Sequence, residues 1–79
     1  MEYLSMYDIK EGAAAEIVGL NCRNEIKQRF MELGMIKGTK VKCVLCAPFG
    51  TIKAYSVAGS VIAIRKKDAC DILVREVVL

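Results

Sequence analysis

The cysteines are the residues with the clearest chemical potential in this chain, because the sequence contains four of them and no histidine. Without histidine the chain lacks the usual general base and the commonest metal ligand. Cys43 and Cys46 have the C-x-x-C spacing of zinc knuckles and redox motifs, whereas Cys22 and Cys70 stand alone. The spacing therefore raises two candidate chemistries, metal binding and thiol redox chemistry.

The strand pattern around Cys43 argues against both. Residues three apart on a regular strand face opposite sides, so we expect Cys43 in the core with Val41 and Leu45, while Cys46 points outward. A bulge would have to bring the thiols together, and the sequence has no second cysteine pair to complete a tetrahedral zinc site. The redox motif begins a helix, which is not expected here. We predict reduced thiols, no metal site and no cofactor, apart from a weakly held transition-metal ion on Cys46.

Other catalytic arrangements are missing from the sequence. No glycine-rich phosphate loop ending in Gly-Lys-Ser or Gly-Lys-Thr is present. The serines, Ser5, Ser56 and Ser60, have no base and orienting partner nearby in the sequence, and the carboxylates are scattered. We therefore predict that the protein is not an enzyme.

The composition is that of one small globular domain covering residues 1–79, with 54% hydrophobic residues and a single proline. No apolar run approaches the roughly 20 residues needed to span a bilayer. The first residues, Met1 to Leu4, lack the basic start and apolar stretch of a signal peptide. We expect a cytoplasmic protein, which also favours reduced cysteines over disulfides.

Nucleic-acid binding is not favoured. The formal net charge is only +3, and the basic residues are spread over several segments. Single-strand binding on small barrels usually adds aromatic platforms on which bases stack. Tyr55 near Lys53 is the one suggestive pair, so we predict no nucleic-acid partner.

A helix is predicted over residues 24–33, followed by a glycine stop. Ile26, Phe30 and Leu33 recur at helical spacing and form one apolar face. Gly34 is placed as the residue that follows a helix in the left-handed conformation, which makes Phe30 and Met35 the pair that meets in a Schellman motif. We expect Phe30, Leu33 and Gly34 to be buried.

The start of this helix is predicted to be capped by Asn21 or Asn24, whose side-chain oxygen can accept from a free backbone N–H. Beyond Gly34, Met35 and Ile36 are expected to form the outward edge of the joint between the helix and the next strand.

Short strands account for most of the remaining sequence, with helical turns near residues 4–9 and 66–70. The predicted strands cover residues 13–20, 39–47, 52–57, 61–65 and 71–78. Gly19 is expected to weaken the first strand or to mark a bulge. About five short strands favour a small barrel over a sandwich, because closure removes exposed strand edges. The helix, inserted between the first two strands, would cover one open end.

Apolar residues in or beside the predicted turns are candidates for a docking surface. The residues that we predict to contact a partner are Met35, Ile36, Phe49, Lys53 and Tyr55. The apolar residues 77–79 could extend such a patch.

Four segments, in order, resemble the FeoA family of small cytosolic proteins of bacterial ferrous iron uptake. Residues 29–38 are similar to the family signature Arg-Leu-x-x-Leu-Gly-Leu-x-x-Gly, and residues 4–12 and 15–20 are similar to its opening and first strand. Residues 59–65, 68–69 and 72–74 are similar to its closing run. Glu11 and Lys37 depart from the family, which often has proline before glycine at these places.

The resemblance implies an all-β fold, an SH3-like β-barrel with a helical insertion. It also implies an accessory role beside the membrane transporter for Fe²⁺ that carries a cytosolic GTPase domain. We therefore predict an adaptor that docks on the cytosolic part of that transporter. The alternative is a thiol-based transition-metal-binding or metal-responsive regulatory protein.

Overall fold

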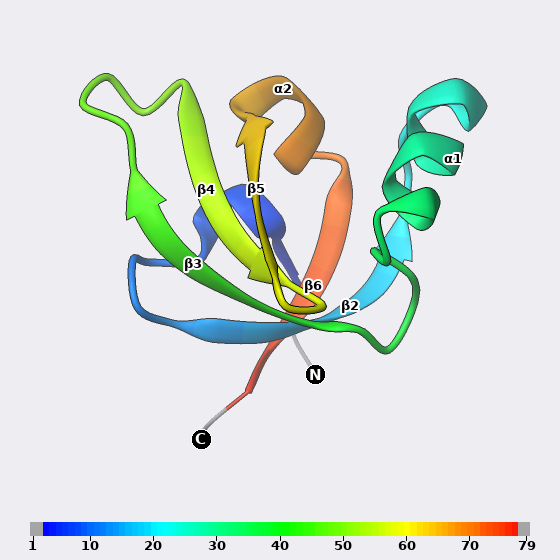
Figure 1. The fold of residues 1–79 in the computed structure, drawn as a ribbon, viewed down its shortest axis with the longest axis horizontal. Coiled ribbons are helices and arrows are strands. Elements are labelled where there is room, and N and C mark those ends of the chain that lie inside the picture. Colours follow the sequence, from blue (N-terminus) through cyan, green and yellow to red (C-terminus); the bar gives the residue numbers. More distant parts are fainter. Residues whose placement is uncertain (1–2, 78–79) are drawn as a thin grey trace.

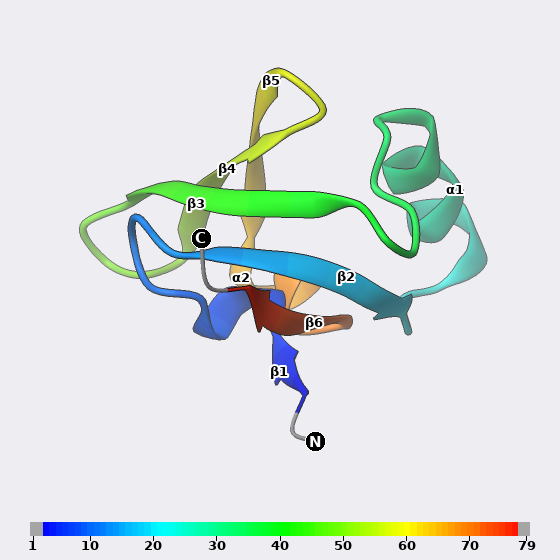
Figure 2. The same cartoon turned by 90° about the horizontal axis from the view of Figure 1, so that it is seen from below.

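Six antiparallel strands form one curved sheet in the computed structural model, which describes residues 3–77. The elements are β1 (Leu4–Ser5), the 3-10 helix η1 (Met6–Asp8), β2 (Ala14–Leu20), α1 (Asn24–Glu32), β3 (Lys40–Cys46), β4 (Ile52–Val57), β5 (Ser60–Arg65), α2 (Lys66–Ala69) and β6 (Ile72–Val77). The strand order is β1-β6-β2-β3-β4-β5. Figure 2 shows β3, β2, β6 and β1 side by side in this order.

The predicted mostly-β fold with one helix is confirmed, with two differences in detail. The additional strand β1 pairs with β6, so α1 follows the second strand rather than the first. The sheet is not closed into a barrel, because β1 and β5 are its two edges. The helical turn α2 connects β5 to β6 without a ladder between them (Figure 1). Val78, predicted to end the last strand, and Leu79 lie outside the described residues.

The core lies on the concave face of the sheet and is filled by alternate strand residues and by the two helical turns. Its buried members are Met6, Ile9, Ala15, Ile17, Phe30, Met35, Val41, Cys43, Tyr55, Val57, Ile64, Ala69, Ile72 and Val74. Tyr55 brings a hydroxyl into this core and donates it to the Met6 carbonyl at 2.9 Å. This bond matters because an unpaired buried hydroxyl would oppose folding.

Two bulges interrupt the regular alternation of the strands. The register of β2 against β6 shifts between Ile17 and Gly19, as the glycine predicts. The register of β3 against β4 shifts between Cys43 and Leu45, which the sequence pattern does not predict. Because Val44 is the extra residue of this bulge, the side chains that follow it face the opposite side of β3 from the one that regular alternation predicts. The prediction that Leu45 shares the core with Val41 is therefore wrong, since 58% of Leu45 is exposed.

Candidate docking surface

The joint after α1 is a Schellman motif, as predicted. The Met35 N–H donates to the Phe30 carbonyl at 2.9 Å, and the Gly34 N–H donates to the Met31 carbonyl at 3.0 Å. Gly34 has a φ of +93°, which side-chain-bearing residues rarely adopt. The N-terminal cap differs from the prediction: Arg23 occupies that position and makes no side-chain capping bond.

Burial around this joint is the reverse of the prediction for two residues. Met35 is fully buried, whereas 44% of Leu33 is exposed. The helix packs through a narrow stripe centred on Phe30, and Leu33 lies about 60° around the helix from that stripe. Met35 enters the core because the left-handed Gly34 reverses the chain and brings the next side chain back against Phe30. Met35 is thus a core residue and cannot belong to a docking surface.

A groove of about 290 Å³ separates α1 from the edge strand β5. The side chains that line it are Ile26, Arg29, Phe30, Leu33, Ile62, Ala63, Ile64, Arg65 and Asp68. Its apolar members come from both walls, and its charged members include an ion pair between Arg65 and Asp68 at 3.4 Å. The groove is therefore an apolar channel with a charged rim.

The backbone of β5 adds free hydrogen-bonding groups beside this groove. The Lys66 N–H donates to the Thr51 carbonyl at 2.8 Å, and Val57 pairs with Ser60 across a two-residue turn. Backbone N–H and C=O groups alternate in direction along an antiparallel strand, so the N–H and C=O groups of Ile62 and Ile64 point toward β4. The N–H and C=O groups of Val61 and Ala63, and the N–H of Arg65, point to the edge of the sheet, whereas the Arg65 carbonyl begins α2 as its N-cap. An edge of this kind can accept another strand.

The other predicted contact residues do not form one surface. Tyr55 is fully buried, so its assignment to a docking surface is wrong: β4 turns Tyr55 and Val57 toward the core. Phe49 is 93% exposed and Ile36 is 48% exposed. They lie beyond opposite ends of β3, because Ile36 precedes the strand and Phe49 follows it.

Lys53 is half-buried, and its ammonium group already makes hydrogen bonds within the molecule. Its ammonium donates to the carbonyls of Tyr7 and Ile9, the latter at 3.1 Å, and lies 4.5 Å from the centre of the Tyr7 ring. The Tyr7 hydroxyl in turn donates to the Gly50 carbonyl. Lys53 therefore holds η1 against β4, and only its outer part is available to a partner.

The C-x-x-C cysteines are neighbours in space. The Sγ atoms of Cys43 and Cys46 lie 3.9 Å apart because the bulge at Val44 places both on one side of β3. Burial raises the pKa of the Cys43 thiol, and the hydrogen bond with Cys46 raises it further. In the part of the chain that the structure describes, no group of three or more Cys, Asp or Glu side chains is placed to hold a metal ion.

Comparison with known proteins decides the family. A family model described as the FeoA domain matches residues 4–76. The chain belongs to the FeoA family. No curated protein sequence matches this FeoA domain at a significant level.

Solved structures establish the SH3-like fold of this FeoA domain. The FeoA protein from Chlorobium tepidum is 25% identical, with a TM-score of 0.91 over 95% of this chain and 71% of that one. The FeoA-like protein from Clostridium acetobutylicum is 22% identical, with a TM-score of 0.88 over 100% and 92%. The zinc-complexed FeoA from Stenotrophomonas maltophilia, described as a procaryotic SH3 domain protein, is 22% identical, with a TM-score of 0.80 over 91% and 89%.

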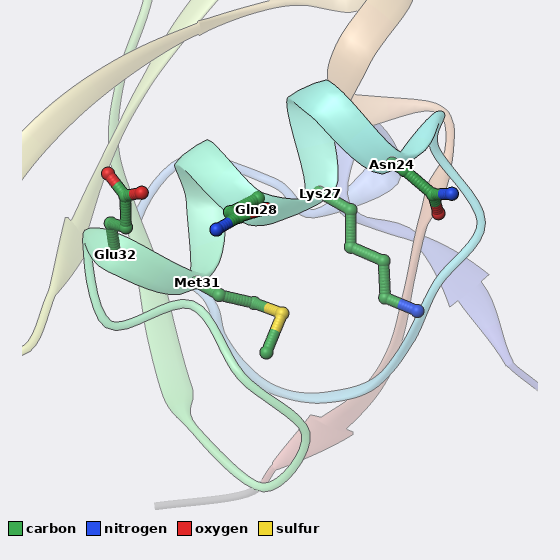
Figure 3. A pocket seen from close by; sticks show the side chains of 5 residues that line it. All are labelled: Asn24, Lys27, Gln28, Met31 and Glu32. Atoms are coloured by element: carbon green, nitrogen blue, oxygen red, sulfur yellow. The ribbon is translucent and has the colours of Figure 1, made fainter.

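The outer face of α1 carries a second, shallower depression. Figure 3 shows that all five side chains around it, Asn24, Lys27, Gln28, Met31 and Glu32, project from the one helix. A surface formed by a single helix does not enclose a ligand, so the groove beside β5 is the better candidate in this FeoA domain. Within residues 3–77, no helix has the length and apolar character needed to cross a membrane.

Proposed function

We propose that this FeoA domain is a cytoplasmic adaptor of bacterial ferrous iron uptake that docks on the cytosolic, GTPase-containing part of the membrane Fe²⁺ transporter. Membership of the FeoA family supports the pathway. The relative from Stenotrophomonas maltophilia is described as possibly acting as a bacterial ferrous iron transport activating factor, which agrees with an accessory role. The observation that carries the docking proposal is the apolar groove beside the free edge of β5.

The proposed contact is the addition of a strand to β5. An extended segment of the transporter pairs with the outward backbone groups of Val61 and Ala63 and with the N–H of Arg65, which gives affinity without regard to sequence. Alternate side chains of that segment enter the groove between Phe30 and Ile62, where apolar groups are preferred. Arg29 at the same groove favours an acidic residue beside the apolar ones.

The contact needs no rearrangement of the core. Phe30, Ile64 and the Schellman joint are already buried or hydrogen-bonded, so the groove is formed before the partner arrives. A pre-formed groove lowers the ordering cost of binding. The role proposed here is therefore recognition, with no chemical step assigned to any residue.

The experiment is calorimetric titration of the protein with the purified cytosolic domain of the transporter. We expect Leu33→Glu to weaken binding at least tenfold, since it places a charge in the groove. Met31→Glu is the matched control: Met31 is 48% exposed on the same helix but lies on the flank away from the groove, beside Leu20 and Ile36. No binding with both proteins concentrated, or equal weakening by both variants, would contradict the proposal.

A further inference from the structure

The bulge in β3 creates an arrangement that the strand pattern does not predict. Cys43 is fully buried and lies opposite Tyr55 in the ladder, whereas Cys46 is half-buried and lies opposite Lys53 near the end of the strand. Because Val44 is the extra residue, both thiols lie on one side of β3, with their Sγ atoms in contact at 3.9 Å. One thiol is thus held by the core and the other is open to solvent.

The separation of the two sulfur atoms can be compared with the separations that a shared metal ion and a disulfide require. Two thiolates on one tetrahedral zinc ion, with Zn–S bonds of about 2.3 Å, lie about 3.8 Å apart. A disulfide requires about 2.05 Å between the sulfur atoms and a close approach of the two Cα atoms. The observed 3.9 Å is the distance of two reduced thiols in contact, and it is close to the first value, so one zinc ion fits the pair with little movement of the sulfur atoms.

We propose that Cys43 and Cys46 form an open, two-thiolate site for a soft d¹⁰ metal ion, Zn²⁺ or Cu⁺. Thiolates select these ions over Fe²⁺, which is harder and binds a given ligand set more weakly than Zn²⁺. The site is therefore distinct from the ferrous cargo of the proposed uptake pathway. It stands independently of the docking proposal, because it uses neither α1 nor the edge of β5.

The absence of a third protein ligand defines the kind of site. Within the described residues no further Cys, Asp or Glu completes the set, so water or a partner's ligand would fill the remaining positions. Structural zinc sites are closed by four protein ligands, whereas open positions permit exchange. Zinc at this site is expected to bind reversibly and not to be required for folding.

The groups around the pair set its response to pH. The Cys46 N–H donates to the Glu11 carboxylate at 3.1 Å. The positive charge of Lys53 lowers the pKa of Cys43, but burial and Cys46 raise it more. Since the ion replaces thiol protons, binding releases protons and strengthens as the pH rises toward the thiol pKa. Tyr55 stays protonated throughout that range because burial raises the pKa of its hydroxyl.

The test is anaerobic titration of the fully reduced protein with Co²⁺, followed by displacement with Zn²⁺. We expect one ion per chain, a thiolate-to-cobalt charge-transfer absorption and the release of protons measured in weak buffer. Zn²⁺ should displace Co²⁺ completely and bind at least tenfold more tightly than Fe²⁺.

The matched variants are Cys46→Ser, at the half-buried end of the pair, and Cys70→Ser, on an exposed cysteine outside it. Circular dichroism of both variants establishes that the fold is retained. Loss of the charge-transfer absorption in Cys46→Ser alone would support the site. Absorption that persists in Cys46→Ser, that disappears in Cys70→Ser, or that never develops at excess ion would overturn it.

Discussion

Gly34 and Ala58 lie so close together that a Cβ added to Gly34 would come within 3.3 Å of the Ala58 Cβ. Gly34 ends the joint after α1, and Ala58 belongs to the turn between β4 and β5. The contact therefore fixes the position of α1 relative to the hairpin whose outer strand is β5. The Thr39 hydroxyl supports the joint by donating to the Gly34 carbonyl at 3.0 Å. The helix held by this joint and the strand β5 form the two walls of the candidate docking groove.

Gly34→Ala is expected to destabilise the protein by roughly 2–3 kcal/mol. The left-handed backbone costs a side-chain-bearing residue about 1–2 kcal/mol, and the close approach to Ala58 adds to it. Urea unfolding measures the change. Gly38→Ala is the matched control, because Gly38 has a similar φ of +95° and no neighbour near the added Cβ. Equal losses in the two variants would show that the contact with Ala58 contributes nothing.

Lys53→Met is expected to lower the free energy of unfolding by about 1–3 kcal/mol, although it removes a charge from a basic protein. The substitution leaves the Tyr7 and Ile9 carbonyls without their donor and removes the ammonium from the Tyr7 ring. Lys66→Met is the comparison, since Lys66 also lies over the Tyr7 ring, at 5.2 Å, but is exposed. Its expected loss is below about 1 kcal/mol. Indistinguishable unfolding curves would argue against the anchoring role of Lys53.

Alkaline pH is expected to destabilise the fold through Tyr55. Burial raises the pKa of this hydroxyl above its ordinary value of 10.0, and the nearby thiols raise it further. A raised pKa means that the folded state holds the proton more tightly, so this contribution is complete below about pH 10 and is lost as the pH rises above it. The free energy of unfolding should fall by up to about 1.4 kcal/mol per pH unit for this group.

Tyr55→Phe separates this titration from other alkaline effects. The variant loses the hydrogen bond to the Met6 carbonyl, so its stability at pH 7 should be lower by about 1–3 kcal/mol. Its unfolding free energy should then fall less steeply than that of the native chain between pH 10 and 11. Parallel pH profiles for the two proteins would exclude Tyr55 as the titrating group.

The features that the sequence predicts well are local ones. The end of α1 at Gly34 follows from helical spacing and from the backbone freedom of one glycine, so the Schellman bonds of Phe30 and Met35 could be assigned without the fold. The bulge at Gly19 was signalled in the same way. The family signature adds the SH3-like architecture, which no single segment determines.

The features that the sequence does not predict depend on distant partners. The bulge at Val44 arises from the pairing of β3 with β4, and no glycine marks its position in the sequence. The alternation of strand residues therefore does not predict the contact between Cys43 and Cys46. The burial of Met35 and the exposure of Leu33 depend on where α1 rests on the sheet. Ile36, Phe49 and Lys53 remain predicted contact residues, although none of the three lines the groove.

The most direct test of the docking proposal is a map of backbone amide chemical shifts in the labelled protein as the unlabelled cytosolic domain of the transporter is added. We predict that the largest changes fall on β5, Ser60–Arg65, and on the inner face of α1 at Ile26, Phe30 and Leu33. Small changes are expected at Met31, on the flank of α1 away from the groove. Changes confined to the turn around Phe49, or no change at a saturating concentration of the partner, would contradict the proposal.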